Sequence, residues 1–93
     1  MKVYLNGEVL AESTETIVVE GNHYFPPSSV NKELFTDSTT STTCPWKGVA
    51  SYYGADVNGK VVNDVAWYYP TPSAKAEHIK DYVAFYKNKV TFE

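Results

Sequence analysis

The sequence predicts a mainly β protein: a compact antiparallel sheet, curled or barrel-like, built from hairpins and accompanied by two short helices. Three observations favour this class. Turn dipeptides separate short runs of β-branched and aromatic residues. Aromatic side chains make up 15% of the chain and suit a pleated surface. Only two segments interrupt the strand pattern with helix-like signals, and 93 residues are enough for one domain spanning 1–93.

Four hairpins are predicted, each from a turn dipeptide between two strand-like runs. The turns and the runs they join are Asn6-Gly7 (2–5 with 8–11), Gly21-Asn22 (17–19 with 23–25), Asn58-Gly59 (49–57 with 60–69) and Asn88-Lys89 (83–86 with 90–92). The two Asn-Gly turns are the strongest signals, because their central residues adopt positive φ readily. About eight short strands follow from the whole pattern.

The two interruptions pair prolines and capping hydroxyls with residues that can form a helix. Pro26-Pro27-Ser28-Ser29 precedes 30–35, and Thr71-Pro72-Ser73 precedes 74–79, so both are predicted to be short helices or helical turns. Residues 36–43 are almost all Ser and Thr. This run suits a connector or a polar edge strand, and the connector is the favoured interpretation.

A two-residue turn at Asn58-Gly59 would fix the register of the longest hairpin. Val57 would lie opposite Lys60, and continuing this register would pair Tyr53 with Asp64, Tyr52 with Val65 and Ala50 with Trp67. One face would then carry Ala50, Tyr52, Val65, Trp67 and Tyr69, and the other Val49, Tyr53, Val57, Val62, Ala66 and Tyr68. Neither face is plainly polar, so both are expected to be partly covered.

Charge and composition disfavour several classes of function. The net charge of −3 gives phosphate backbones no overall attraction, so nucleic-acid binding is disfavoured. A single cysteine can form neither an internal disulfide nor a cysteine zinc site. No apolar run approaches the roughly 20 residues that span a bilayer, and the N-terminal segment breaks at a turn. We therefore expect a cytoplasmic protein without membrane association.

The most chemically suggestive segment is Cys44-Pro45-Trp46-Lys47-Gly48, which places a thiol, an aromatic ring and an amine just before a long strand. An ammonium near a thiol lowers the thiol pKa. Cys44 and Lys47 are therefore candidate catalytic residues. The favoured alternative is a packing role, with Cys44 and Trp46 in the core and Lys47 in solvent. His23 and His78 cannot be placed beside the thiol and are expected to be structural or exposed.

Aromatic residues supply a candidate ligand-binding wall that would stack a planar ligand, although core packing is the commoner explanation. The candidate ligand-binding residues are Tyr24, Trp46, Tyr53, Trp67 and Tyr69. Tyr53 opposite Asp64 would give an oriented hydroxyl and a possible acid or base, or simply a cross-strand hydrogen bond.

Several ordered segments support a resemblance to a known family. They are 19–26, 43–48, 50–53, 66–70 and 83–86, and the most specific combination is Cys-Pro-x-Lys-Gly at 44–48 with Ala-Trp-x-Tyr-x-x-Pro at 66–72. Across nearly its whole length the chain resembles the domain-of-unknown-function family 427. The resemblance implies a compact β fold and a pocket involving Cys44, Lys47, Tyr53, Trp67 and Tyr69.

The family also carries a nucleotidyltransferase-like label, which the residues do not favour. Enzymes of that class generally use acidic metal ligands and a phosphate-cradling loop. The chain has no P-loop or Rossmann glycine pattern, and its four aspartates (Asp37, Asp56, Asp64 and Asp81) are scattered. We therefore expect no metal site and no cofactor.

Three hypotheses about function follow. The leading one is a small-ligand binding domain in which Lys47 attracts an anionic or carbonyl group and the aromatic residues form the walls. The second is an enzyme that uses Cys44 as a nucleophile or redox thiol with help from Lys47. The third is an interaction module that pairs with a protein partner or a second copy, as a homodimer, through exposed aromatic residues and edge strands.

Overall fold

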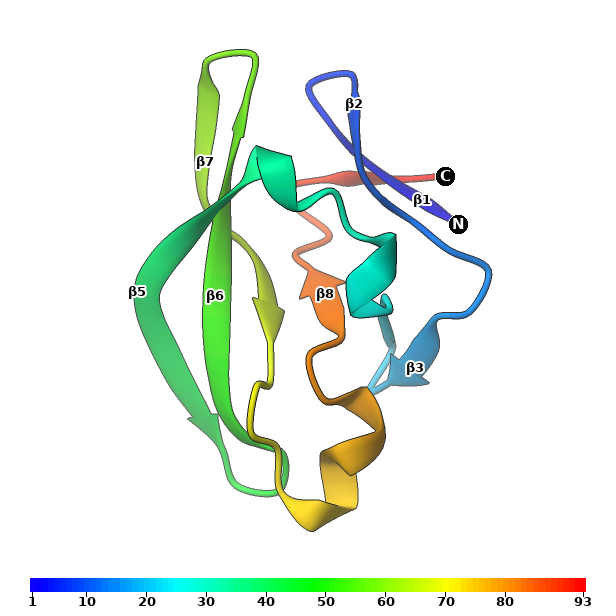
Figure 1. The fold of residues 1–93 in the computed structure, drawn as a ribbon, viewed down its shortest axis with the longest axis vertical. Coiled ribbons are helices and arrows are strands. Elements are labelled where there is room, and N and C mark those ends of the chain that lie inside the picture. The colour runs from blue at the N-terminus through cyan, green and yellow to red at the C-terminus, as the bar shows by residue number, and fades with distance from the viewer.

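The computed structural model describes all 93 residues, Met1–Glu93, as three antiparallel sheets with three short 3-10 helices (Figure 1). The strands are β1 (Lys2–Leu5), β2 (Glu8–Glu12), β3 (Ile17–Val19), β4 (Asn22–Tyr24), β5 (Phe35–Cys44), β6 (Gly48–Val57), β7 (Lys60–Tyr68), β8 (Val83–Phe85) and β9 (Thr91–Phe92), and the helices are η1 (Pro27–Ser29), η2 (Lys32–Leu34) and η3 (Ala74–Ile79). None of these helices has the length and apolar character needed to traverse a bilayer.

The sheets have the strand orders β2-β1-β9, β3-β4 and β5-β6-β7-β8. The predicted mainly β class and antiparallel pairing are confirmed, but the three sheets do not close into a barrel. The β3–β4 hairpin joins the large sheet through paired backbone hydrogen bonds between Phe25 and Val83, of 2.8 and 2.9 Å. This link places the β3–β4 hairpin beside β8 and fixes where its tip lies.

Three of the four predicted hairpins form. Both Asn-Gly turns have positive φ at their two central residues, as predicted. The third hairpin forms one residue earlier than predicted, because Val19 pairs with Asn22 and the turn is Glu20-Gly21. Glycine occupies the second central position in all three turns, so Glu20 takes the place that asparagine has in the other two, with φ 53°. Its side chain is thereby placed at the hairpin tip.

The predicted hairpin at Asn88-Lys89 is wrong. β9 pairs with β1, where Val3 lies opposite Phe92, and β8 pairs with β7 instead. Reciprocal backbone hydrogen bonds of 2.9 and 2.8 Å between Lys2 and Glu93 bring the two termini together, as Figure 1 shows. A local turn signal cannot reveal which distant strand offers a free edge, and here that edge belongs to β1.

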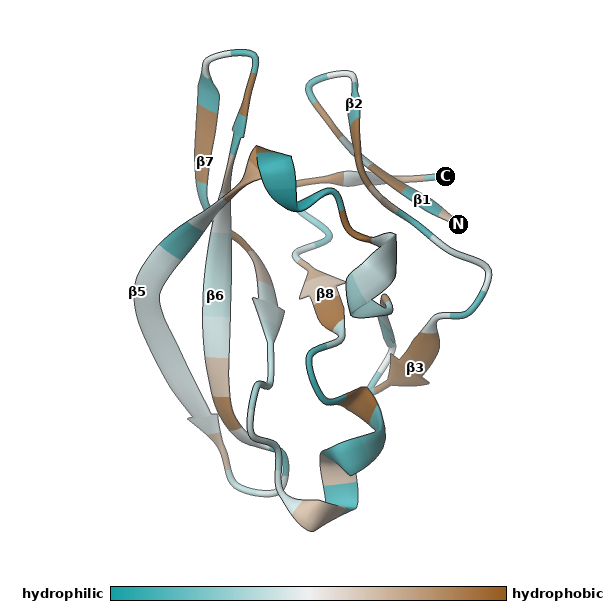
Figure 2. Cartoon of the chain, in the orientation of Figure 1, coloured by the Kyte–Doolittle hydropathy of each residue, from teal (hydrophilic) through white to brown (hydrophobic).

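The Ser/Thr run at 36–43 forms most of β5, so the favoured connector was wrong and the alternative of a polar edge strand is confirmed. Backbone pairing with β6 does not depend on the side chains, and threonine suits extended backbone. The pale colour of β5 in Figure 2 reflects this polar composition. The two predicted helical segments are confirmed as 3-10 turns, η1 with η2, and η3.

The register of the β6–β7 hairpin slips by two residues. Val57 pairs with Lys60 as predicted, but Tyr53 pairs with Ala66 and Tyr52 with Trp67. The predicted pairs of Tyr53 with Asp64, Tyr52 with Val65 and Ala50 with Trp67 are therefore wrong. The cause is a bulge in which Gly54 faces residues 63–65, with Asp64 at φ 53°.

A second bulge lies on the other side of β6. The pairing of β5 with β6 also slips by two residues between Asp37 and Ser41. Across the two bulges, the Ser38 hydroxyl donates to Asp64 Oδ1 at 2.6 Å and the Thr40 hydroxyl donates to Asp64 Oδ2 at 2.7 Å. The bulges of β5 and β7 are therefore linked by hydrogen bonds that cross the intervening strand β6.

Because a slip of two residues keeps the alternation of faces, the predicted division of aromatic residues largely holds. Tyr52, Trp67 and Tyr69 pack in one hydrophobic cluster with η3, whereas Tyr53 and Tyr68 pack in another beneath β1 and β2. Val65 is an exception, since it lies in the second of these clusters, and Val49 is half exposed. Both faces of the hairpin are covered, as the sequence predicted.

Gly54 offers a direct test of the bulge. A Cβ at this position would lie 2.7 Å from Thr36 Oγ1 and 3.2 Å from the Val62 carbonyl oxygen. We expect Gly54→Ala to lower the free energy of unfolding by about 1–3 kcal/mol, as overpacking does. Urea unfolding measures this. The double variant Gly54→Ala with Thr36→Ala should recover part of the loss relative to Thr36→Ala alone. If Gly54→Ala is as stable as the parent, the bulge can accommodate a methyl group at this position and the predicted overpacking is contradicted.

Candidate functional site

The candidate site is built around the three-residue loop 45–47 that joins β5 to β6. Cys44 lies opposite Gly48, whose φ of 112° is a conformation that favours glycine. The backbone N–H of Ser73 donates to the Lys47 carbonyl at 2.9 Å, and the Ser73 hydroxyl donates to the Trp46 carbonyl. The segment before η3 therefore holds this loop in place, at the end of the molecule where Figure 1 shows the two meeting.

Lys47 is buried, with 6% of its surface exposed, and is the only charged residue in the core. Its Nζ forms an ion pair with Glu20 Oε1 and lies 5.1 Å from the centroid of the Trp46 ring and 5.7 Å from that of Tyr69. Lysine is rarely buried without such a partner. The ring faces add cation–π attraction to the ion pair.

The ion pair stays charged at neutral pH. Burial lowers the pKa of Lys47, but the hydrogen bond to Glu20 and the electrostatic influence of Tyr24, Tyr69 and Cys44 together outweigh burial, so the net pKa is raised. The same hydrogen bond lowers the pKa of the Glu20 carboxyl. Lys47 is therefore an ammonium and Glu20 a carboxylate across the physiological range.

Glu20 was missed by the sequence analysis. Its carboxylate accepts from two donors, Lys47 Nζ on Oε1 and the Trp46 indole Nε1 on Oε2, the latter at 3.5 Å. The available signal was the turn pattern: placing Gly21 second, as in the Asn-Gly turns, would have placed Glu20 at the tip. Its pairing with a lysine 27 positions along the chain left no local signal.

An aromatic wall lies next to the ion pair. The Trp67 indole N–H donates to the Tyr24 hydroxyl at 3.1 Å, with the rings edge to face, and Trp67 also lies 4.8 Å from the Tyr86 ring. Burial raises the pKa of Tyr24 and raises that of Tyr69 to about 12. Both phenols are therefore neutral hydroxyl groups at physiological pH. Tyr24, Tyr69 and Trp67 pack with Cys44 in one cluster, and Lys47 Nζ lies against the Tyr69 ring of that cluster.

Cys44 is a half-buried free thiol packed against the same aromatic cluster. Burial raises its pKa, but backbone N–H donors of Trp46 and Lys47 and the charge of Lys47 together outweigh burial, so the net pKa is lowered. This combination favours the thiolate, which is the nucleophilic form.

The structure thus brings together six of the seven predicted site residues: Tyr24, Cys44, Trp46, Lys47, Trp67 and Tyr69. The favoured expectation that Lys47 lies in solvent was wrong, because the residue is buried. Trp46, expected in the core with Cys44, is instead partly exposed at the rim, with 37% of its surface accessible.

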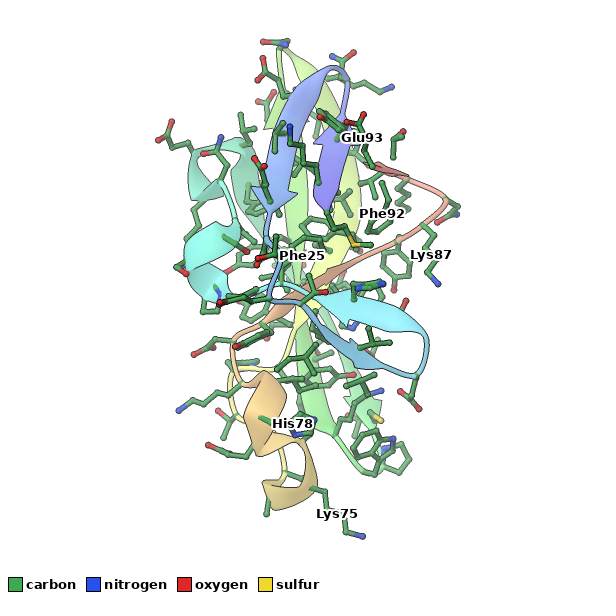
Figure 3. All side chains as sticks on the ribbon, turned by 90° about the vertical axis from the view of Figure 1, so that its right-hand side faces the viewer. Phe25, Lys75, His78, Lys87, Phe92 and Glu93 are labelled. Carbon is green, nitrogen blue, oxygen red and sulfur yellow. The ribbon has the colours of Figure 1, made fainter.

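Tyr53 lies apart from this group. Its ring stacks on Phe35 and Tyr68 at centroid distances of 5.3 and 4.4 Å, in the other hydrophobic cluster. Its predicted partner Asp64 is held by hydroxyls of β5 instead. The two histidines are also separate, because His23 Nδ1 is hydrogen-bonded to the Thr16 hydroxyl and His78 is exposed on η3 (Figure 3).

Two hollows open on the surface. One, of about 350 Å³, adjoins the site and is lined by Pro45, Trp46, Ser73, Ala74 and Lys75; Figure 3 shows Lys75 projecting from the same end of the molecule. The other, of about 360 Å³, lies over the bulges and is lined by Thr36, Asp37, Ser38, Thr39, Thr40, Gly54, Asn63 and Asp64. No group of three or more His, Cys, Asp and Glu side chains is arranged to hold a metal ion.

These features define a small antiparallel β protein with a buried lysine, a half-buried thiol and an aromatic wall at one end of its large sheet. Residues 1–93 match the model of the family described as "Domain of unknown function (DUF427)", and the chain belongs to this family. The resemblance inferred from the Cys-Pro-x-Lys-Gly and Ala-Trp-x-Tyr-x-x-Pro motifs is therefore confirmed. A comparison with curated proteins found no match.

The state of the Cys44 thiol can be tested by its alkylation rate against pH. Because the pKa is lowered, the rate of reaction of the folded protein with iodoacetamide should have its midpoint below the value of about 8.5 for free cysteine. Lys47→Met should raise the midpoint, whereas Lys60→Met, which removes an exposed lysine at the far hairpin, should not. A midpoint at or above the free value, or alkylation only after unfolding, would contradict the lowered pKa.

Proposed function

We propose that the protein binds a small anionic, planar ligand at Lys47 and its aromatic neighbours. One observation carries the proposal: the buried ammonium of Lys47 faces two aromatic rings and has as its anionic partner a carboxylate whose side chain is 53% exposed. The charge is thus fixed inside the protein, while the group that neutralises it lies at the surface.

Stability alone gives a weak reason for this arrangement. Replacing a buried ion pair with apolar residues is often neutral or stabilising, because removing charges from water is costly. Titratable groups with shifted pKa values that gather at one place are typical of functional sites. Here Glu20, Tyr24, Cys44, Lys47 and Tyr69 all have shifted pKa values and lie in one cluster.

The neighbouring side chains suit a planar anion. The ammonium supplies charge, the tyrosine hydroxyls supply hydrogen-bond donors, and the ring faces supply stacking surfaces. Trp46 both covers Lys47 and lines the 350 Å³ hollow, so a ligand seated in that hollow contacts a residue of the site. The exposed amine of Lys75 adds a second positive charge at the rim.

A second candidate is covalent chemistry at Cys44, favoured by the lowered pKa of a half-buried thiol. In acyl transfer, the thiolate sulfur would attack a carbonyl carbon, and the C=O π electrons would move to oxygen. Collapse of this adduct would form a thioester and expel the leaving group with its bonding electrons, which then takes a proton from water. The alkylation profile of Cys44 decides whether the required thiolate exists.

Ligand binding can be tested by thermal shift with anionic and neutral planar compounds, including aromatic carboxylates and nucleoside monophosphates. A true ligand should stabilise the parent protein by about 2.7 kcal/mol at roughly a hundredfold excess over Kd. Lys47→Met should remove the response and Lys60→Met should keep it. The proposal fails if no anionic compound raises the Tm, or if Lys47→Met responds as the parent does.

A further inference from the structure

We infer that the ligand of this site carries a carboxylate group, which replaces the carboxylate of Glu20 on Lys47. The inference rests on the proposed function and deepens it by naming the ligand chemistry. The side chain of Glu20 shows which chemical group suits the hydrogen-bond donors of the site, because both donors are bound to its carboxylate.

Two donors from the β5–β6 loop converge on the two oxygens of one carboxylate. Lys47 Nζ donates to Oε1, and Trp46 Nε1 lies 3.5 Å from Oε2. An ammonium and an indole N–H can only donate, so both need an acceptor. A flat group with two acceptor oxygens on one carbon satisfies both donors together. The pair of donors is therefore suited to a carboxylate.

Glu20 can leave this position without unfolding the site. Its side chain is 53% exposed and rotates about three χ angles, so movement into solvent needs no change in the core. Its backbone is in the left-handed region at φ 53°, which is unfavourable for glutamate, and β3–β4 is a short two-stranded hairpin. Lys87 Nζ donates to the Gly21 carbonyl at 2.9 Å and holds the backbone of the tip, so the movement is confined to the Glu20 side chain.

Lys47 would stay desolvated after Glu20 moves away. The rings of Trp46 and Tyr69 cover the ammonium, and Ser73 holds the loop that carries it. A buried ammonium without an anion is costly, so the opened site favours a new one. The displaced Glu20 carboxylate remains nearby and repels negative charge. A monoanionic carboxylate is therefore favoured over a more highly charged phosphate.

The experiment uses benzoate as the probe, with neutral benzamide and inorganic phosphate for comparison. Calorimetry measures the Kd of each for the parent protein, Glu20→Ala and the control Glu15→Ala, which removes an exposed glutamate five residues before Glu20. Benzoate should bind the parent, bind Glu20→Ala at least about tenfold more tightly, and bind Glu15→Ala as it binds the parent. Adding Lys47→Met to Glu20→Ala should abolish binding, and benzamide and phosphate should bind the parent more weakly than benzoate does.

The outcomes separate this inference from the proposal on which it rests. If anions bind through Lys47 but Glu20→Ala binds benzoate no more tightly than the parent, or the parent prefers phosphate to benzoate, the carboxylate inference is overturned and the proposed function stands. If no anion binds any of the proteins, both are overturned. Should Glu20→Ala fail to fold, Glu20→Gln keeps the side-chain shape without the charge. Benzoate must then bind Glu20→Gln more tightly than the parent, and equal affinity overturns the inference.

Discussion

The ion pair between Lys47 and Glu20 is the interaction on which the organisation of this end of the molecule depends. It joins the β5–β6 loop to the tip of the β3–β4 hairpin, two segments that no strand pairing connects. Removing either partner would leave a charge without its counterion, and for Lys47 that charge is buried under two rings. Lys47 therefore requires an anion at this place, and Glu20 supplies it from the hairpin tip.

The bulges of β5 and β7 leave the aromatic residues near this ion pair on one face of the sheet. Each bulge slips the register by two residues, which preserves the face of every side chain beyond it. Trp67 and Tyr69 consequently remain on the face of Tyr52, toward Lys47, while Tyr53 faces the other core. Asp64 fixes the bulge through the hydroxyls of Ser38 and Thr40, and Lys89 Nζ donates to the Asp64 carbonyl at 3.2 Å.

Local chemistry made part of this structure predictable. The Asn-Gly turns, the 3-10 segments and the division of the hairpin faces follow from residue types and alternation, which depend on near neighbours in the chain. The grouping of Cys44, Lys47, Trp67 and Tyr69 was indicated by the motifs that carry the family resemblance.

The remaining features depend on contacts between distant segments. The pairing of β9 with β1 requires knowledge of a free edge elsewhere, and the bulge opposite Gly54 contains Asp64, which is hydrogen-bonded to hydroxyls of the distant strand β5. The role of Glu20 needed both the correct turn position and the position of Lys47, and only the first has a local signal. Lys47 was expected in solvent because a lone lysine usually lies there.

The most direct test of this account is an NMR titration of the lysine ε-methylene groups, with the Lys47 signal assigned by its loss in Lys47→Met. The account predicts that these protons are shifted upfield by the rings of Trp46 and Tyr69. It also predicts that the amine titrates above the ordinary pKa of a lysine side chain, because the hydrogen bond to Glu20 and the nearby phenol and thiol groups together outweigh burial. A Lys47 signal without a ring-current shift, titrating at or below the ordinary lysine value, would contradict the buried ion pair.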